Sequence, residues 1–441
     1  MALIQYRPSG STAKEIATDL ESAVREGHLR PGDLLPSVRA LATDLGVAPG
    51  TVATAYASLR ERGLVRTQGR GGTRISARPP VAARSLTLPL TAGILDLSDG
   101  QPDPDLLPAV PARTVISGQP AQAPSELLLP TLLDLGRERL VAAGVPADSL
   151  TLAGGGLDAV HRVLAAHLRP EDLIAVEDPG WPNLLDLVAA LGLRTFPLLI
   201  DADGPVPTSM AAALRAGARA VVVTARAQNP TGASLGRERA AELRAMLAEA
   251  DHVLVVEDDH AAELSSEPLH TLAGATASWA HVRSVSKPYG PDLRLALISG
   301  DAATVARVDG RLQVTSGWIS TLLQRVVVDL WTDEKSSAAV SLAGHTYDQR
   351  RQALIAALAD QGIPAVGASG LNVWVPVTEE AEVVERLRRD GWAVAPGERF
   401  RQTSTPGIRI TVSRLTPETI PELARAVAAT LTQDSPRRYT N

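Results

Sequence analysis

The chain has 441 residues, of which 45% are hydrophobic and 21% are charged, so it is long enough for two or three domains and too apolar to be disordered. It contains no cysteine, which excludes disulfides, thiolate metal sites and cysteine nucleophiles, and we expect no metal site. No apolar run approaches about 18 residues, and the N-terminus lacks the apolar core of a signal peptide. We therefore expect a cytoplasmic protein that does not bind a membrane.

The net charge of −6 is unevenly distributed along the chain. Residues 1–78 contain 11 basic and 7 acidic residues, whereas the remainder contains 32 basic and 42 acidic residues. A basic N-terminal region joined to an acidic body indicates that the N-terminal region is the part that meets a polyanion.

The N-terminal region has the pattern of three helices followed by a β-hairpin. Apolar residues recur at helical spacing within Ser11–Glu26. A second helix is expected between Ser37, whose hydroxyl can cap it, and Gly46, which tolerates a left-handed backbone conformation. A third helix opens at residues 47–51, and a glycine-rich turn at 68–72 joins two short strands. This order is typical of a winged helix-turn-helix.

A winged helix reads DNA with a helix N-terminus and holds phosphates with flanking residues. Thr51 lies in the first turn of the third helix, where a small polar group can approach base edges. The residues predicted to contact DNA are Ser37, Arg39, Gly50, Thr51, Tyr56, Arg66, Arg70 and Gly72. The alternative is a solvated helical domain with an arginine-rich surface.

The string LPSVRALATDLGVAPGTVATAYASLRERGLVRTQGRGGTRIS resembles the GntR-family winged helix, and the resemblance covers roughly residues 11–76. It implies binding to double-stranded DNA. Pro49 stands where that family commonly has a DNA-contacting arginine. Proline suits a helix start but donates no hydrogen bond there, so one sequence-reading contact is expected to be absent.

The rest of the chain has the pattern of an α/β protein. Residues 77–93 are rich in proline and alanine and read as a linker. From about residue 94, short apolar runs alternate with helical stretches, which predicts a mostly parallel sheet with helices on both faces. After about residue 340 the pattern changes to that of a smaller α+β lobe. We therefore expect a winged helix at 1–76, a linker at 77–93, a larger domain at 94–340 and a C-terminal lobe at 341–441.

Lys287 is one of only three lysines among the 43 basic residues, and it follows an apolar run in the segment SVSKPYGPDLR. Only a lysine among these basic residues can form an imine with an aldehyde cofactor. Ser284, Ser286 and Arg294 lie in the same segment and could hold the cofactor's phosphate. Taken alone, Lys287 would be interpreted as a surface lysine.

Four other segments carry residues suited to such a cofactor. Asp258 ends an apolar strand, where a carboxylate can pair with a pyridinium nitrogen, and Asn229 in the segment NPTG can hydrogen-bond a phenolic oxygen. The glycine-rich turn at 153–157 precedes a helix, so its backbone amides can bind an anion. Trp181 follows a strand and can stack on a flat ring. Each of these residues has an ordinary structural explanation when it is taken singly.

Their order along the chain resembles that of fold-type I PLP-dependent aminotransferases (PLP, pyridoxal 5'-phosphate), over roughly residues 94–432. The resemblance implies a mostly parallel seven-stranded sheet with flanking helices and a smaller C-terminal lobe. It assigns cofactor binding to Gly156, Leu157, Trp181, Asn229, Asp258, His260, Ser284, Ser286, Lys287 and Arg294. Lys287 would form the internal aldimine, and Arg409 would bind the carboxylate of an effector. His260 stands where the family usually has tyrosine.

A GntR winged helix joined to an aminotransferase-like body resembles the MocR/GabR-type transcriptional regulators. This resemblance implies a homodimeric, PLP-dependent regulator that binds DNA and senses a small amine, an amino acid or PLP itself. Two alternatives are an active aminotransferase with an appended DNA-binding domain and a PLP-free scaffold. The presence of Lys287, Asp258 and Asn229 together argues against the scaffold.

Overall fold

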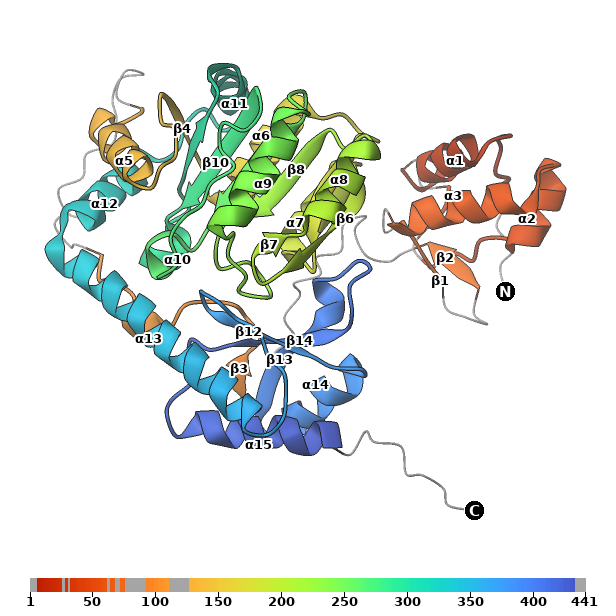
Figure 1. Ribbon diagram of the computed structural model, residues 1–441. Coiled ribbons are helices and arrows are strands. Elements are labelled where there is room, and N and C mark those ends of the chain that lie inside the picture. The colour runs from red at the N-terminus through yellow and green to blue at the C-terminus, as the bar shows by residue number, and fades with distance from the viewer. Residues whose placement is uncertain are drawn as a thin grey trace, which may run out of the picture. The chain divides into compact units, whose positions relative to one another are not determined.

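The computed structural model describes residues 6–25, 28–30, 32–61, 64–67, 72–75, 93–110 and 127–432 (Figure 1). The expected linker at 77–93 lies outside the described residues except for Gly93. An N-terminal helical unit and a large α/β body are each described separately below.

The N-terminal unit has the expected order of three helices and a hairpin. Its elements are α1 (Ala13–Arg25), α2 (Val38–Leu45), α3 (Pro49–Glu61), β1 (Val65–Thr67) and β2 (Thr73–Ile75). The two strands pair antiparallel. Apolar side chains from all three helices and the hairpin form one core. The winged helix-turn-helix fold is therefore confirmed.

The ends of α2 form as the sequence predicts. The Ser37 hydroxyl accepts a hydrogen bond from the Ala40 amide at 3.2 Å, which caps the helix start. At the other end Gly46 has φ +67°, and its amide bonds back to the carbonyls of Ala42 and Thr43. This left-handed conformation is cheap for glycine and strained for most other residues, so α2 ends there.

The body contains a large sheet whose strand order is β4-β11-β10-β9-β8-β5-β6-β7. Its strands are β4 (Ser149–Ala153), β5 (Leu173–Asp178), β6 (Arg194–Asp201), β7 (Gly204–Pro205), β8 (Ala220–Thr224), β9 (Leu254–Asp259), β10 (Ser278–Ser284) and β11 (Ala296–Gly300). β11 runs antiparallel to both β10 and β4, and β10, β9, β8, β5 and β6 are parallel. The expected mostly parallel sheet of seven strands is present, with the two-residue β7 as an addition on the β6 edge.

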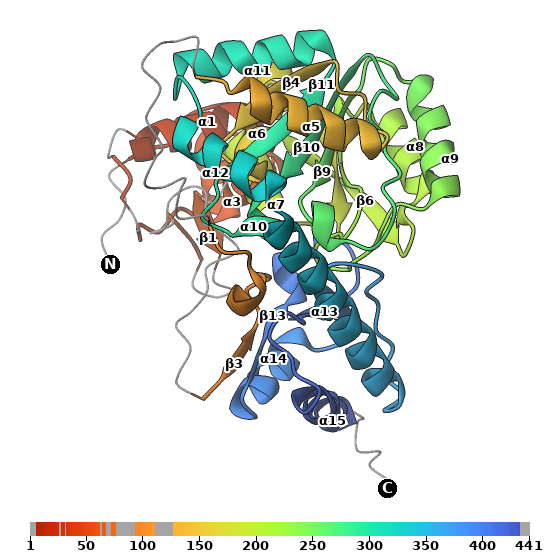
Figure 2. The ribbon, with the colours of Figure 1, turned by 90° about the vertical axis from the view of Figure 1, so that its left-hand side faces the viewer.

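Helices cover both faces of this sheet (Figures 1 and 2). They are α5 (Pro130–Ala142), α6 (Gly156–His167), α7 (Pro182–Ala190), α8 (Pro207–Arg215), α9 (Arg237–Ala248), α10 (Ser286–Tyr289), α11 (Ala302–Val314) and α12 (Thr321–Thr332). α8 and α9 pack on one face, and α6 and α11 pack on the other. Because β4, β5, β8, β9 and β10 run in one direction, the side chains that follow them gather at one edge, which is where open α/β sheets bind ligands.

The C-terminal part of the body has a second sheet of order β12-β14-β13-β3. Its elements are β3 (Leu95–Leu97), α13 (Glu334–Ala359), β12 (Asn372–Pro376), α14 (Glu380–Arg389), β13 (Trp392–Pro396), β14 (Gly407–Thr411) and α15 (Thr419–Thr432). α13, α14 and α15 contribute apolar residues to a core shared with this sheet (Figure 2).

Two details of this part differ from what the sequence pattern predicts. Leu95–Leu97 was expected in the larger domain but pairs in parallel with β13 in the smaller sheet. The boundary expected at residue 340 falls inside α13, which starts at Glu334. The pairing of Leu95–Leu97 is long-range, which a local hydrophobic period does not report. The early start of α13 has a local cause, because the Asp333 side chain caps the helix by accepting from the Ser336 amide. In the part of the chain that the structure describes, no helix is both long and apolar enough to span a bilayer.

Candidate functional site

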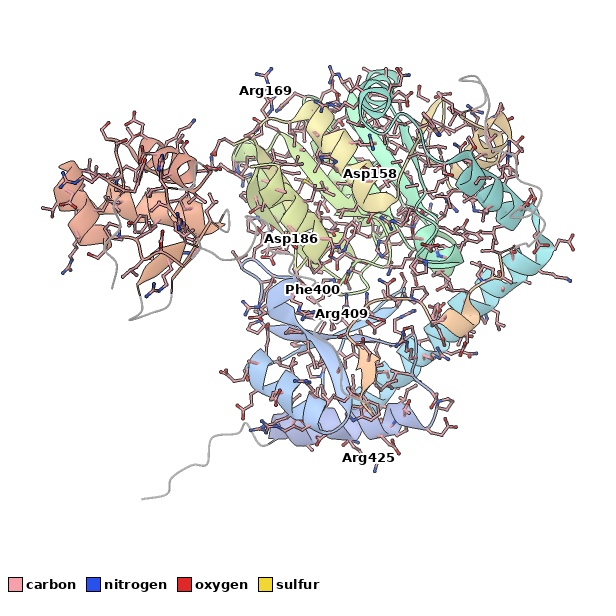
Figure 3. All side chains as sticks on the ribbon, turned by 180° about the vertical axis from the view of Figure 1, so that it is seen from behind. Asp158, Arg169, Asp186, Phe400, Arg409 and Arg425 are labelled. Atoms are coloured by element: carbon pink, nitrogen blue, oxygen red, sulfur yellow. The ribbon has the colours of Figure 1, made fainter. Side chains whose placement is uncertain are left out.

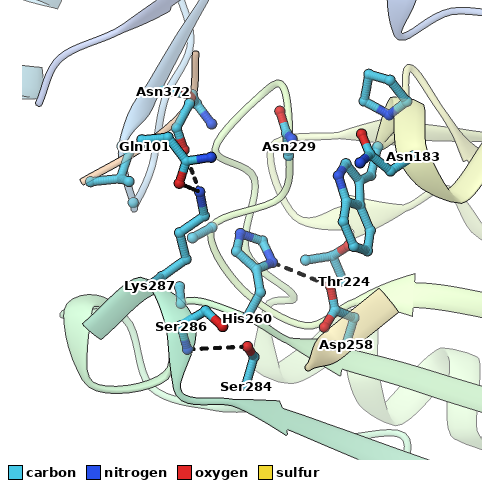
Figure 4. Close-up of a pocket in the computed structure, with 18 of the residues that line it drawn as sticks. Gln101, Asn183, Thr224, Asn229, Asp258, His260, Ser284, Ser286, Lys287 and Asn372 are labelled. Carbon is cyan, nitrogen blue, oxygen red and sulfur yellow. Dashed lines mark hydrogen bonds and ion pairs between the residues drawn. The ribbon is translucent and has the colours of Figure 1, made fainter. Parts of the chain in front are cut away.

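A pocket of about 610 Å³ lies in the body at the carboxyl ends of the parallel strands (Figure 4). The residues that the sequence assigned to the cofactor and the effector all line it: Gly156, Leu157, Trp181, Asn229, Asp258, His260, Ser284, Ser286, Lys287, Arg294 and Arg409. They come from the large sheet, its following loops and strand β14. The folding of the chain thus brings these residues together, while their individual roles stay predictions.

Lys287 lies in the short helix α10 and points its amine at a segment far away in sequence. Its Nζ donates to the Gly100 carbonyl at 2.5 Å and to Gln101 Oε1 at 3.0 Å (Figure 4). Burial lowers the pKa of Lys287 to about 8, and the nearby positive charge of Arg409 acts in the same direction. A lysine with this pKa has a substantial neutral fraction near neutral pH, which is the form that attacks an aldehyde.

Asp258 is the penultimate residue of β9 and offers an unused acceptor. The residue is buried, with 4% of its surface exposed, and its Oδ1 has no hydrogen-bond partner among the described residues. Its Oδ2 lies 3.4 Å from Nδ1 of His260 (Figure 4). A buried carboxylate oxygen without a donor is costly. The orphaned Oδ1 therefore fits a ligand that supplies an N–H, such as a protonated ring nitrogen.

The turn before α6 forms a cradle suited to an anion. Gly155 has φ +105°, and a Cβ on it would come within 2.6 Å of the Arg294 guanidinium. Only glycine therefore fits this close approach. α6 begins directly after, at Gly156, so its first amides and the positive end of its dipole face the same turn as Arg294.

The two serines of this region are not equivalent. Ser284 accepts from the Ser286 amide at 3.3 Å, as Figure 4 marks. The Ser286 hydroxyl donates to the Leu293 carbonyl at 2.9 Å. The Ser286 hydroxyl would have to rotate away from the Leu293 carbonyl before it could donate to a phosphate. The Ser284 hydroxyl could donate to a phosphate without losing a bond that it already donates.

Arg409 on β14 is buried and already has partners (Figure 3). Its Nη1 donates to Asn229 Oδ1 at 2.9 Å, and its Nη2 donates to the Ser98 carbonyl at 2.5 Å. The guanidinium lies 4.8 Å from the centre of the Phe400 ring. Burial lowers the pKa of Arg409 to about 10. A ligand carboxylate must therefore compete with an amide oxygen and a backbone carbonyl for this cation.

Sequence reasoning missed the segment Ser98–Gln101, which contacts Lys287 and Arg409 and also lines the pocket. Gly100 approaches Arg409 so closely that a Cβ there would lie 3.0 Å from Nη1. The segment follows β3 and lies within the stretch LSDGQPDPDLLP. Its contacts at Gly100 and Ser98 use backbone carbonyls, which any residue provides, and only the Gln101 side chain carried a residue-type signal.

A buried network behind the pocket fixes the loop that carries Asn229. Glu177 accepts from the Thr224 amide at 2.8 Å and from Gln228 Nε2 at 3.1 Å. Burial raises the pKa of Glu177 to about 7, although these hydrogen bonds oppose the shift. Gln228 also accepts from the Thr231 amide at 3.1 Å, so both sides of Asn229 are held.

On the N-terminal unit, the predicted DNA-contacting residues fall into three groups. Ser37, Arg39 and Gly50 are exposed, and Thr51 is partly exposed. Gly72 has φ +77°, a conformation that favours glycine. Arg70 lies outside the described residues, as does the side chain of Arg66.

Tyr56 corrects one of these predictions. It is 5% exposed, and its hydroxyl donates to the Pro36 carbonyl at 2.9 Å. Burial raises its pKa. Tyr56 is therefore a core residue that ties α3 to the start of α2, and its side chain is not presented to DNA.

Comparisons with known proteins agree with both halves of the chain. Residues 12–75 match the family described as bacterial regulatory proteins, gntR family, and residues 141–427 match aminotransferase class I and II. The chain is 39% identical over 419 residues to the vitamin B6 salvage pathway transcriptional repressor PtsJ of Salmonella typhimurium, covering 94% of this chain and 97% of PtsJ. The chain belongs to the MocR-type transcriptional regulators.

Further similarities place this MocR-type regulator in the same group. It is 28% identical over 476 residues to the HTH-type transcriptional regulator TauR of Rhodobacter capsulatus, covering 96% of this chain and 97% of TauR. Its body superposes on a kynurenine aminotransferase of Pyrococcus horikoshii with a TM-score of 0.71 and 20% identity, covering 78% of this chain and 92% of the enzyme. This structural likeness shows the aminotransferase fold. GntR regulators bind DNA, and class I and II aminotransferases depend on PLP.

Proposed function

We propose that this regulator binds PLP through Lys287 and that PLP occupancy controls its attachment to DNA. The observation that supports this most is the convergence of three complementary groups on one pocket. These are an amine with a pKa of about 8, a buried carboxylate oxygen without a donor, and an anion cradle at the start of α6. An aldehyde, a ring N–H and a phosphate are the groups that they would complement.

When bound, the cofactor supplies an aldehyde that condenses with an amine and a ring that withdraws electrons. Neutral Lys287 would be the nucleophile. Asp258 Oδ1 would accept from the ring nitrogen and hold its proton. Arg294 and the first amides of α6 would bind the phosphate.

PLP itself is the signal that we favour. The name of PtsJ refers to vitamin B6 salvage. A second relative, the HTH-type pyridoxine biosynthesis transcriptional regulator PdxR of Corynebacterium glutamicum, is 32% identical over 283 residues, covering 60% of this chain and 59% of PdxR. Nη1 and Nη2 of Arg409 already donate to Asn229 and Ser98, so a carboxylate would have to displace these bonds to pair with both nitrogens, although Nε has no partner among the described residues. An amino-acid effector would act as a second ligand, whose carboxylate would displace Asn229 and Ser98 from the guanidinium of Arg409.

The test is a PLP titration of the full chain, followed by visible absorbance and by binding to its own promoter DNA. Wild type should develop an absorption band that borohydride removes, and PLP should change its DNA affinity. Lys287→Ala should lack the band yet bind DNA as ligand-free wild type does. Lys335→Ala, which removes an exposed lysine of α13, is the matched control and should behave as wild type. A wild-type protein without a band in excess PLP would contradict the proposal.

Transamination is a second candidate, because Lys287, Asp258 and Arg409 line the same pocket. Sustained conversion of an amino acid to its keto acid, measured with PLP and an acceptor keto acid, would support it. Homodimerisation is a separate part of the proposal, which rests on the resemblance to MocR/GabR-type regulators. Light scattering of the full chain tests it, and a monomer at all concentrations would contradict it.

A further inference from the structure

The first turn of α6 carries a carboxylate next to the anion cradle. Asp158 Oδ2 accepts the Gly154 amide at 2.8 Å, and it lies 3.3 Å from where a Cβ on Gly154 would be. The side chain is therefore folded back over the glycine turn. Gly156 and Leu157, which lie between these two residues in sequence, line the pocket. Figure 3 labels Asp158 on this helix.

Among the described residues, Arg162 is the cation that pairs with this carboxylate. Arg162, one turn further along α6, donates its Nε to the same Oδ2 at 2.8 Å. Its two terminal nitrogens donate to the hydroxyls of Thr315 and Ser316, each at 3.1 Å. Thr315 and Ser316, which follow α11, therefore hold Arg162 in place, and its charge pairs with that of Asp158.

The charge of Asp158 is not needed for its hydrogen bond. A neutral amide oxygen at this position could also accept the Gly154 amide, although the bond would be weaker than that of a carboxylate. A carboxylate adds a negative charge within the first turn of α6, where the helix dipole and free amides favour an incoming anion. It competes with a phosphate for this positive potential and repels it, because neighbouring like charges interact unfavourably at partly buried sites.

We infer that Asp158 lowers the affinity of the pocket for the phosphate of its ligand and that Arg162 limits this effect. The inference rests on the proposed function, and it concerns how tightly the ligand is held. A site with reduced affinity loses ligand when its concentration falls, so occupancy follows concentration. Asp158 would thereby adapt an aminotransferase-like pocket to sensing.

The test compares two aldehydes that differ only by the phosphate, PLP and pyridoxal. Both are titrated into the full chain and followed by visible absorbance. Asp158→Asn keeps the acceptor for Gly154 and removes the charge, so it should bind PLP about threefold to tenfold more tightly. Its affinity for pyridoxal should equal that of wild type. The difference for PLP should shrink at high salt, because mobile ions screen the repulsion.

Arg162→Gln tests the opposite change in charge, because it removes the cation that pairs with Asp158. It removes the balancing cation while keeping a donor for Asp158, so PLP should bind about threefold to tenfold more weakly and pyridoxal should bind as before. Asp134→Asn is the matched control, because it removes an exposed carboxylate of α5 that pairs with Arg137. Neither aldehyde should distinguish this control from wild type.

Equal changes for PLP and pyridoxal would overturn the inference and leave Asp158 as a helix cap. An unchanged or weaker PLP affinity in Asp158→Asn would overturn it as well. If Asp158→Asn fails to fold, Arg162→Gln alone decides, and unaltered PLP binding in that variant rejects the inference. Wild-type protein that binds neither aldehyde would instead reject the proposed function, a result that is recognised before any variant is made.

Discussion

The pocket of the body and the surface of the N-terminal unit use positive charge in opposite ways. In the pocket, burial lowers the pKa of Lys287 to about 8 and that of Arg409 to about 10. On the N-terminal unit, Arg39 is exposed near the start of α2. Buried cations act through altered chemistry and fixed partners, whereas exposed cations act through long-range attraction that salt screens. The two regions should therefore respond to different perturbations.

A change of pH should separate them most strongly. With a pKa of about 8, about a tenth of Lys287 is neutral at pH 7, roughly two orders of magnitude more than for an ordinary lysine. Because the neutral amine is the nucleophile, the rate of reaction with PLP should rise with pH and level off above about pH 8. Arginines keep their charge over this range, so ligand-free DNA binding should not follow the same curve. Stopped-flow absorbance measures the rate; a rate still rising steeply at about pH 10 would contradict the lowered pKa.

Asp258→Asn should affect the pocket and leave the N-terminal unit unchanged. Removing the charge from the orphaned acceptor should weaken PLP binding by about tenfold to a hundredfold, as expected for one charge-assisted hydrogen bond. Equilibrium titration by absorbance measures the loss. Asp360→Asn, an exposed carboxylate after α13, is the control. Unchanged PLP affinity in Asp258→Asn would show that this oxygen does not meet the ring nitrogen.

Arg39→Ala should produce the reverse pattern. DNA affinity should fall about threefold to tenfold on any duplex, and the slope of log affinity against log salt should become about one unit shallower. PLP binding should be unaffected. Fluorescence anisotropy across a salt series measures both quantities, with Arg425→Ala on the exposed side of α15 as control. A loss confined to one DNA sequence would show that Arg39 reads bases and not phosphates.

Tyr56→Phe should give the smallest effect, and it tests the correction made above. Losing the bond to the Pro36 carbonyl should lower the stability of the N-terminal unit by about 1 kcal/mol. Faster hydrogen exchange in α3 would report this loss. DNA affinity at low temperature should stay the same. If affinity falls while exchange is unchanged, Tyr56 contacts DNA after all.

The sequence was most informative where the chemistry demands one residue type. Lys287 could be found because an imine requires lysine and lysine is rare in this chain. Asp258 and Asn229 could be placed beside it because Asp258 lies near the end of one parallel strand and Asn229 follows the neighbouring one, and such strands end at one edge of the sheet. Glycine at 155 follows from its positive φ and its contact with Arg294.

The rest depended on packing that residue types do not encode. The pairing of Leu95–Leu97 with β13 joins segments nearly three hundred residues apart, so no local period reveals it. The error at Tyr56 was avoidable. Val52, Ala55, Tyr56 and Leu59 lie on one helical face, and that spacing predicts a core position. The family-based expectation of a DNA contact had been given more weight than this period.

The contacts of Ser98–Gln101 have a consequence for how the protein could distinguish its ligands. One short stretch of backbone accepts a hydrogen bond from Lys287 at the Gly100 carbonyl and another from Arg409 at the Ser98 carbonyl. An aldehyde that consumes the amine of Lys287 would release the first bond alone. An amino acid that then takes over the aldehyde would free this amine again, while its carboxylate would compete for the second bond. The states with no ligand, with aldehyde alone and with aldehyde plus amino acid would therefore leave different hydrogen bonds on this stretch.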